Sequence, residues 1–359
     1  MDLDLTPEQE LLRESVRRTC ERHCGVDVVR KLENDPIGYS PALWSALGEL
    51  GLHGLTISED DGGSGMTILD AAIIYEELGR AIVPSPHFVT SVLSAGVLSR
   101  LGRTELLPDI AAGETVLTVA WLEPGGGFTD RGINARIDNN TLTASKRHVP
   151  FARSADRLLV LARENDDIAI AIVDPNAAGV TVEQRLTVAG DTQYDVTFDK
   201  TPVETVLPSA WAAWNDTMLD GAILLAAQAV GGARAALDLA VDYAKTRQQF
   251  DKPLGAFQAL AHYLADAATA VDGAQTLTWE AAWARTTGAG NAAQLAPMAK
   301  LYAGRTFRDV TATAVQIFGG VGFTVDFDIQ LYFRRAKSLQ LNWWDDRHLE
   351  ELIAQSVLT

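Results

Sequence analysis

One stretch of the chain combines residue types that could bind a phosphorylated ligand. The stretch YAKTRQQFDKPLGAFQALAHYLAD begins at Tyr243 and places Arg247, Phe250 and Gln258 around a Pro-marked break between two helical patterns. A guanidinium offers fixed, paired donors to phosphate oxygens. An exposed arginine at the end of a helix is also favoured by the helix dipole. Arg247 is therefore either an anion-binding residue or a cap.

A second stretch, QIFGGVGF, begins at Gln316 and contains the glycine pair Gly319 and Gly320. Glycine has no Cβ, so the backbone there can approach a ligand closely. The same residues also mark an ordinary transition from helix to loop. By itself this run is weak evidence for a ligand site, and the presence of the first stretch in the same chain strengthens that evidence.

The spacing of apolar residues predicts the helices and strands that position these residues. Apolar residues with helical spacing run through 6–112, and short alternating β-branched segments separated by Gly, Asn and Asp turns fill 114–208. Helical spacing then returns from about residue 210 to the end of the chain. We expect a mainly α protein with a β domain, divided into an N-terminal α-helical domain (1–113), a middle antiparallel β-barrel or sheet domain (114–209) and a C-terminal four-helix bundle (210–359).

Composition excludes several functional classes. The formal net charge of -17 argues against a nucleic-acid binder, because neutralisation of phosphates by Lys and Arg supplies most non-specific affinity. No apolar run approaches the ~20 residues of a membrane-spanning helix, and the acidic start MDLDLTPEQELLRES lacks the features of a signal peptide. We therefore expect a cytoplasmic protein. Cys20, Cys24 and His23 do not complete a tetrahedral ligand set, so no metal site is predicted.

The two stretches together resemble the flavin-binding C-terminal half of the acyl-CoA dehydrogenase family. LTPEQELLRESVR and GLHGLTISEDDGGSGM resemble the family's opening helices and the loop before its third helix, so the resemblance covers essentially the whole chain. It implies FAD as cofactor, α,β-desaturation of an acyl-CoA substrate, and an electron-transfer flavoprotein as acceptor. It also implies a homo- or hetero-oligomer, a dimer of dimers, because in the family these segments of one subunit reach the FAD of its neighbour.

The resemblance assigns particular residues to the flavin. Trp121 and Leu122, in VAWLEPGGGFTD, occupy positions whose backbone or hydroxyl usually bonds the flavin ring. In the next strand, residues 149–151 (Val-Pro-Phe) stand where an aromatic-Ile-Thr triplet is common, so a ring-contacting hydroxyl is missing. The other implied FAD-binding residues are those of the two stretches: Arg247, Phe250, Gln258, Gln316, Gly319 and Gly320.

The catalytic base is the main departure from the family. Desaturation requires a base that takes the acidic α-proton, and the family uses a glutamate. Counting from Arg335-Ala336-Lys337 places Trp343 at the commoner base position, and counting back from Gly231 places Gly221 at the other. Neither position carries a glutamate.

The nearest carboxylates to these positions are those of Asp345, Asp346 and Asp220. Each of the three could act as the base if the backbone were shifted by about one residue, although Asp is shorter than Glu and needs closer placement. The structural alternatives are a solvated loop for the Asp345-Asp346 pair and the N-terminal turn of a helix for Asp220.

A different interpretation explains the departures together. Some members of the family, especially in actinobacterial sterol degradation, form heteromers in which one subunit carries the base and its partner completes the flavin or acyl site. This chain resembles the partner type, and we favour that hypothesis. The alternatives are a self-sufficient dehydrogenase with an Asp base, or a family member with altered flavin chemistry.

Overall fold

The structure is a computed structural model that describes residues 4–358. The chain folds into two compact units, each assembled from separate stretches of sequence. The helical unit comprises the chain up to Val29, Ile68–Val83, and the chain from Ala222 onward. The sheet unit comprises Arg30–Thr67 and Pro84–Gly221. The domain boundaries at residues 113 and 209 remain a prediction.

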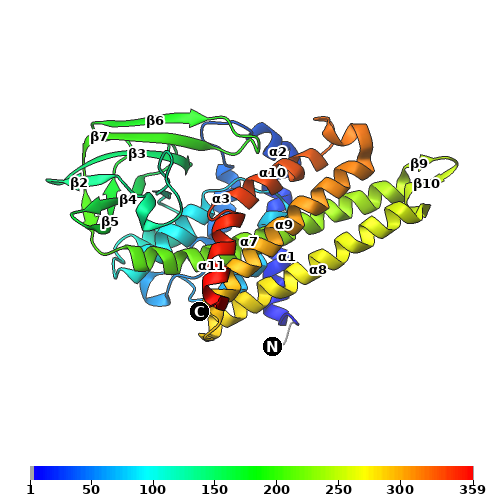
Figure 1. Cartoon of the computed structure of the whole chain (residues 1–359), viewed down its shortest axis with the longest axis horizontal. Helices are drawn as coiled ribbons and strands as arrows, with labels where there is room; N and C mark the ends of the chain where they lie inside the picture. Colours follow the sequence, from blue (N-terminus) through cyan, green and yellow to red (C-terminus); the bar gives the residue numbers. More distant parts are fainter. Residues whose placement is uncertain (1–3, 359) are drawn as a thin grey trace. The chain divides into compact units, whose positions relative to one another are not determined.

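Long helices form the helical unit, where α7, α8 and α9 run side by side (Figure 1). An added Cβ at Gly231 of α7 would lie 1.8 Å from the carbonyl oxygen of Glu76 in α4, so glycine permits this close approach of two helices. The elements are α1 (Pro7–His23), α2 (Val26–Lys31), α4 (Ile68–Arg80), α7 (Trp211–Thr246), β9 (Gln248–Gln249), β10 (Lys252–Pro253), η5 (Leu254–Ala256), α8 (Gln258–Thr287), α9 (Ala292–Phe318), η6 (Gly319–Phe323), α10 (Ile329–Leu341) and α11 (Asp346–Leu358). Helices α2 and α7 each cross a boundary between the units.

Helix α7 corrects the expectation about apolar runs. Within residues 4–358 it is the one helix that is long and apolar enough to cross a membrane, with a window of mean hydropathy 1.3. Of that window, 78% is buried inside the protein, as in the core helix of a globular fold. Interspersed Ala and Gly residues and single polar residues hide this apolar segment when the sequence is searched for an uninterrupted run.

The sheet unit contains one eight-stranded sheet, in the order β6-β7-β3-β2-β4-β5-β8, with β1 paired to β4. Most neighbours are antiparallel, as expected, but β4 pairs in parallel with both β1 and β2. The strands are β1 (Leu117–Ala120), β2 (Arg136–Asp138), β3 (Thr141–Pro150), β4 (Arg157–Glu164), β5 (Asp167–Val173), β6 (Val180–Arg185), β7 (Gln193–Pro202) and β8 (Thr205–Leu207). The helices are α3 (Pro41–Glu49), η1 (Leu52–Gly54), η2 (Glu59–Asp61), the π-helix η3 (Phe88–Ser94), α5 (Ala95–Arg100), α6 (Leu107–Ala112) and η4 (Asp130–Gly132).

Candidate active site

The first predicted stretch forms the exposed end of α7 and the start of α8. Arg247 follows the last residue of α7, and β9 pairs with β10 to make a short hairpin whose turn holds Phe250 and Asp251. Phe250 is 85% exposed, and Arg247 and Gln258 are exposed as well. Within the described residues, no side chain bonds the Arg247 guanidinium. The guanidinium is therefore available to an anionic group from outside the unit.

The glycine stretch lies at the same end of the helical unit. Helix α9 ends at Phe318, whose ring stacks on that of Tyr243 in α7 with 4.2 Å between centroids. Gln316 is exposed, and a Cβ added at Gly319 or Gly320 would meet nothing within 4 Å. The structure therefore brings the two stretches together beside open space. This backbone and the available guanidinium fit a bulky anionic cofactor that lies across the surface.

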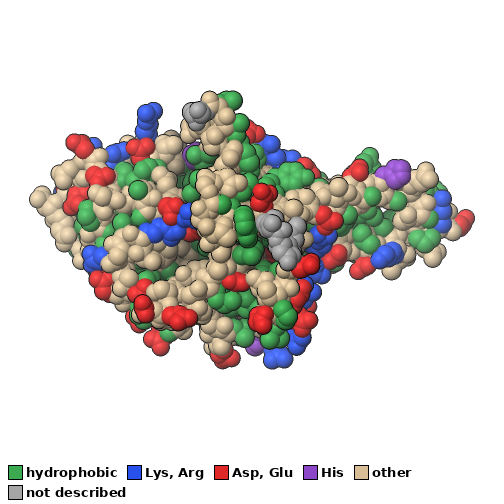
Figure 2. Space-filling model, turned by 90° about the horizontal axis from the view of Figure 1, so that it is seen from below, with side chains coloured by type: hydrophobic (Ala, Val, Ile, Leu, Met, Phe, Trp, Pro, Cys, Tyr) green, Lys and Arg blue, Asp and Glu red, His purple; other side chains and the backbone are tan. Residues whose placement is uncertain are grey.

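Exposed apolar side chains surround these residues. Phe250, Tyr263, Phe323 and Val325 are each more than half exposed, from 57% for Tyr263 to 85% for Phe250. Figure 2 shows hydrophobic side chains between charged ones on the projecting end of α7 and α8. Large apolar side chains at such exposure are typical of an interface with another chain.

In the sheet unit, Trp121 and Leu122 follow the end of β1. The Trp121 side chain is 5% exposed and packs against Trp214, with 5.0 Å between ring centroids. The Trp121 carbonyl accepts a hydrogen bond from Lys146 Nζ at 3.2 Å, and the Leu122 carbonyl accepts one from the backbone N–H of Arg147 at 2.9 Å. This segment is therefore held by β3, with both carbonyls occupied.

Lys146 is fully buried and forms an ion pair with Glu123 at 2.7 Å. Burial lowers the pKa of Lys146 to about 8, although the Glu123 charge opposes that shift. For Glu123, burial raises the pKa, but the charge and hydrogen bond of Lys146 and two backbone N–H groups lower it by more. The sequence pattern does not indicate this pair, because a lysine within an alternating strand pattern usually faces solvent.

The commoner base position lies in the loop between α10 and α11. Trp343 and Trp344 have φ angles of 55° and 76°, in the left-handed region that favours glycine. Asp345 Oδ1 accepts the backbone N–H of His348 at 2.9 Å, and its carbonyl accepts that of Leu349. Asp345 is thus the N-cap of α11. The solvated-loop alternative is incorrect for this residue.

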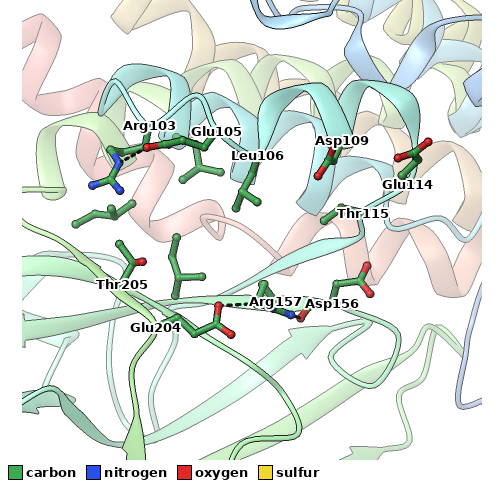
Figure 3. A pocket seen from close by; sticks show the side chains of 13 residues that line it. Arg103, Glu105, Leu106, Asp109, Glu114, Thr115, Asp156, Arg157, Glu204 and Thr205 are labelled. Atoms are coloured by element: carbon green, nitrogen blue, oxygen red, sulfur yellow. Dashed lines mark hydrogen bonds and ion pairs between the residues drawn. The ribbon is translucent and has the colours of Figure 1, made fainter.

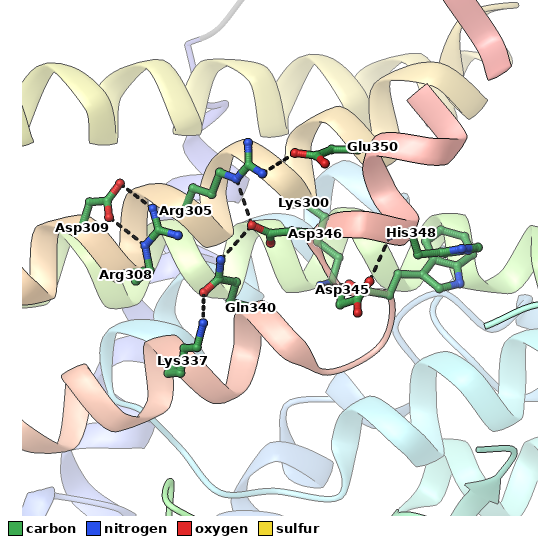
Figure 4. Close-up of polar contacts among 11 residues, drawn as sticks. Lys300, Arg305, Arg308, Asp309, Lys337, Gln340, Asp345, Asp346, His348 and Glu350 are labelled. Carbon is green, nitrogen blue, oxygen red and sulfur yellow. Dashed lines mark hydrogen bonds and ion pairs between the residues drawn. The ribbon is translucent and has the colours of Figure 1, made fainter. Parts of the chain in front are cut away.

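A buried lysine and an ion-pair network fix the same loop (Figure 4). Lys300 Nζ, from α9, donates to the carbonyls of Trp344 at 2.8 Å and Leu339 at 3.4 Å. Burial lowers the pKa of Lys300 to about 7, with the nearby carboxylates of α11 opposing the shift. Asp346 accepts hydrogen bonds from Arg305 Nε at 2.9 Å and from Gln340 at 2.8 Å. Asp346 is therefore also engaged in structural contacts.

Neighbouring side chains occupy the space around Gly221, the second predicted base position. A Cβ added at Gly221 would lie 3.1 Å from Leu93 Cδ2 and 3.2 Å from Phe88 Cζ. Asp220, only 6% exposed, pairs with Arg100, which also bonds Asp216 at 2.6 Å. Because α7 begins at Trp211, Asp220 lies well inside the helix and not in its N-terminal turn.

The sheet unit also contains a cavity of about 560 Å³ near α6 and the strand ends of β4, β5 and β8. Figure 3 shows that carboxylates dominate its polar lining, with Arg157 bound to Glu204 at 2.6 Å and Arg103 facing Glu105 at 3.4 Å. None of the predicted site residues lines this cavity. Its acidic lining is also unsuited to the phosphates of a nucleotide cofactor.

Known proteins resemble this chain along nearly its whole length. Family models described as "Acyl-CoA dehydrogenase, N-terminal domain" and "Acyl-CoA dehydrogenase, C-terminal domain" match residues 6–114 and 211–345. "Acyl-CoA dehydrogenase IpdE2" of Mycolicibacterium smegmatis is 34% identical over 336 residues, which cover 92% of this chain and 93% of that relative.

Solved structures show the same similarity in three dimensions. A variant of the "Tcur3481-Tcur3483 steroid ACAD" superposes with a TM-score of 0.87 and 29% identity, covering 98% of this chain and 99% of that one. Butyryl-CoA dehydrogenase from Megasphaera elsdenii gives a TM-score of 0.90 with 26% identity and full coverage of both chains. This chain therefore belongs to the acyl-CoA dehydrogenase family, a family of flavoprotein oxidoreductases with an N-terminal helical domain, a central β-sheet domain and a C-terminal helical domain.

Proposed function

We propose that this chain is the cofactor-completing subunit of a heteromeric acyl-CoA dehydrogenase, in which a Glu-bearing homologue supplies the base for α,β-desaturation. One observation carries the proposal. The two family base positions hold Trp343 and Gly221, and the carboxylates nearest to them are all committed to structural contacts.

The geometry argues against an Asp base. A base must point at the substrate proton within hydrogen-bond reach. To act as a base, Asp345 would have to break its capping bond to α11. Asp346 would have to break its bonds to Arg305 and Gln340, and Asp220 would have to break its ion pair with Arg100. Because each move would break a helix cap or an ion pair, none of these groups is preorganised for proton abstraction.

FAD is the cofactor that the residues present would hold. Bound FAD supplies a hydride acceptor for the substrate β-carbon. The Arg247 guanidinium would pair with its pyrophosphate, and Gly319 and Gly320 would allow its adenosine end to approach the backbone. Phe250, Gln258 and Gln316 border the same open space at this end of the unit, whereas Trp121 and Leu122 would face the flavin ring.

A second chain fits the exposed end of the helical unit. Arg247 and the glycine pair face outward there, among exposed apolar side chains, so the FAD they bind would be shared with a neighbouring subunit. The relative whose name reads "Tcur3481-Tcur3483 steroid ACAD" carries a paired designation, and we take it as support for a heteromer and a steroid-derived acyl-CoA. An electron-transfer flavoprotein would be the acceptor, and the assembly would be cytoplasmic.

The visible spectrum tests the proposal. The chain purified alone is treated anaerobically with acyl-CoA thioesters of different chain length and ring content, and is then co-expressed with a Glu-bearing homologue from the same genome. We expect no bleaching of flavin absorption by the chain alone, and bleaching by the co-expressed complex. Bleaching by the chain alone would overturn the subunit proposal in favour of the self-sufficient dehydrogenase.

A further inference from the structure

We infer that Lys146 and Glu123 are positioning residues for the flavin-facing segment Trp121–Leu122. This inference rests on the proposed function, since it takes that segment to contact FAD. Neither side chain needs to contact the cofactor. Both act by holding in place the backbone that would contact it.

The first step is the separation of two strands. Strands β1 and β4 pair in parallel from Leu117↔Arg157 to Ala120↔Val160, and the ladder ends there. The next residues in register are Trp121 and Leu161. Both carbonyls would remain without a partner inside the protein, at a cost that folded proteins avoid.

Lys146 occupies this fork. Its Nζ donates to the Leu161 carbonyl at 2.6 Å and to the Trp121 carbonyl at 3.2 Å. The side chain comes from β3 and is 0% exposed, so no water competes for these bonds. An ammonium group has three donors, and one remains after the two carbonyls.

Glu123 takes the third donor and connects the segment to the following loop. Its Oε1 accepts from Lys146 Nζ at 2.7 Å and from the backbone N–H of Ala135 at 3.0 Å, and its Oε2 accepts from that of Asn134 at 2.8 Å. Glu123 also neutralises the buried ammonium charge, which would otherwise be costly in this interior. The segment between β1 and this loop is thereby held at both ends.

A gain in stability does not explain why the Lys146–Glu123 ion pair is buried. A buried ion pair is often no better for stability than apolar residues of the same volume. The distinctive effect of this ion pair is geometric, because it fixes the positions of the Trp121 carbonyl and the Glu123 side chain. A ligand bonded through Trp121 and Leu122 would then meet a backbone that is already in place.

The test is FAD affinity, measured on the assembly as it is purified. Lys146→Met keeps the length of the side chain and removes all three donors, and Glu123→Gln keeps the shape and removes the charge. Ser94→Ala is the matched control, since it removes a buried hydrogen bond, from the Ser94 hydroxyl to the Val89 carbonyl at 2.6 Å, in the same unit but within η3 and outside the sheet. The measurements are the FAD dissociation constant by flavin fluorescence, the visible circular dichroism of bound flavin, and the melting temperature.

We expect Lys146→Met to weaken FAD binding at least tenfold and to change the flavin dichroism, with Glu123→Gln intermediate. Ser94→Ala should lower the melting temperature without either effect. Folded Lys146→Met and Glu123→Gln proteins that both bind FAD within twofold of the parent would overturn the inference. If Lys146→Met does not fold, Glu123→Gln alone decides. A parent assembly that binds no FAD would overturn the proposed function and this inference with it.

Discussion

The ammonium group of Lys300 lies 2.8 Å from the carbonyl oxygen of Trp344, in the loop that holds the predicted base position Trp343. The lysine is 3% exposed and also donates to the Leu339 carbonyl, near the C-terminal end of α10. It therefore acts as a C-terminal cap from a neighbouring helix, and it bonds the second of two consecutive tryptophans in left-handed conformations. The loop is therefore held in one fixed conformation.

Lys300→Met should destabilise the protein by an amount that grows with pH. Two buried carbonyls lose their donor, each worth about 1–3 kcal/mol. The pKa of Lys300 is lowered to about 7 in the folded protein from an ordinary 10.5. Between these values the unfolded chain binds the extra proton, so the parent gains stability as pH rises, and the Met variant lacks that gain.

Chemical denaturation of both proteins at pH 7 and pH 10 measures this difference, with tryptophan fluorescence as the signal. The gap in free energy of unfolding should be larger at pH 10. A gap that is equal at both pH values, or larger at pH 7, would contradict the buried, neutralised state of Lys300.

The carboxylate of Asp345 should prove to be a cap. Asp345→Asn keeps an oxygen that accepts the His348 N–H, and should change the free energy of unfolding by only a few tenths of a kcal/mol. Asp345→Ala should cost about 1 kcal/mol. Both variants should keep the flavin-reduction behaviour of the parent assembly. Loss of reduction in Asp345→Asn, with FAD still bound, would instead identify Asp345 as the base.

The sequence predicts the order of helical and sheet elements because their periodicities are local properties of short segments. The family resemblance likewise brings together Arg247 and Gly319, which the structure places at one end of the helical unit. The role of Lys146 could not be predicted, because its burial depends on the parallel pairing of β1 with β4, two strands that β2 and β3 separate in the sequence. The capping contact of Asp345 could not be predicted for a similar reason, since an N-cap is defined only by the residue at which the following helix begins.

The two base positions should differ in their tolerance of glutamate. Gly221→Glu would place a side chain against Leu93 and Phe88 in the interior, and should destabilise the protein by at least ~3 kcal/mol through overpacking and burial of a carboxylate. Trp343 is only partly buried, so Trp343→Glu should fold. Thermal denaturation of the two variants compares them directly, and equal stability would contradict the packing around Gly221.

Trp343→Glu also tests which position is the family base position in this chain. A carboxylate there should allow the chain to reduce its flavin slowly with an acyl-CoA thioester, where the parent alone does not. The matched variant Trp343→Gln has the same size and no base, and should remain inactive. Bound FAD that neither variant reduces would reject the assignment of Trp343.

Acid should unfold the sheet unit through two buried histidines. His53 and His87 lie 5.6 Å apart between ring centroids, and their Nε2 atoms bond the carbonyls of Trp44 and Leu52. Burial lowers the pKa of both, that of His87 to about 3 with the neighbouring His53 contributing. Each gains its proton only on unfolding, so stability is full above pH 6.5 and is lost as pH falls towards the folded pKa.

Each histidine should steepen the loss of stability by up to about 1.4 kcal/mol per pH unit in that window. His87→Gln keeps an amide donor for the Leu52 carbonyl and cannot titrate. Its free energy of unfolding, measured by denaturant at pH 6, 5 and 4, should therefore fall less steeply than that of the parent. Parallel slopes for the two proteins would show that His87 is already protonated in the folded state.

Arg247 should matter to the cofactor and little to the fold. Its side chain is exposed and, within residues 4–358, has no bonding partner, so Arg247→Ala should leave the melting temperature within about 1 °C of the parent. The loss of paired donors to the pyrophosphate should weaken FAD binding at least tenfold. Arg347→Ala is the control, since the Arg347 side chain is 87% exposed on α11 and pairs with Glu351 at 3.2 Å. Equal FAD content in the two variants, at equal stability, would show that Arg247 is the ordinary helix-end arginine that its sequence also allows.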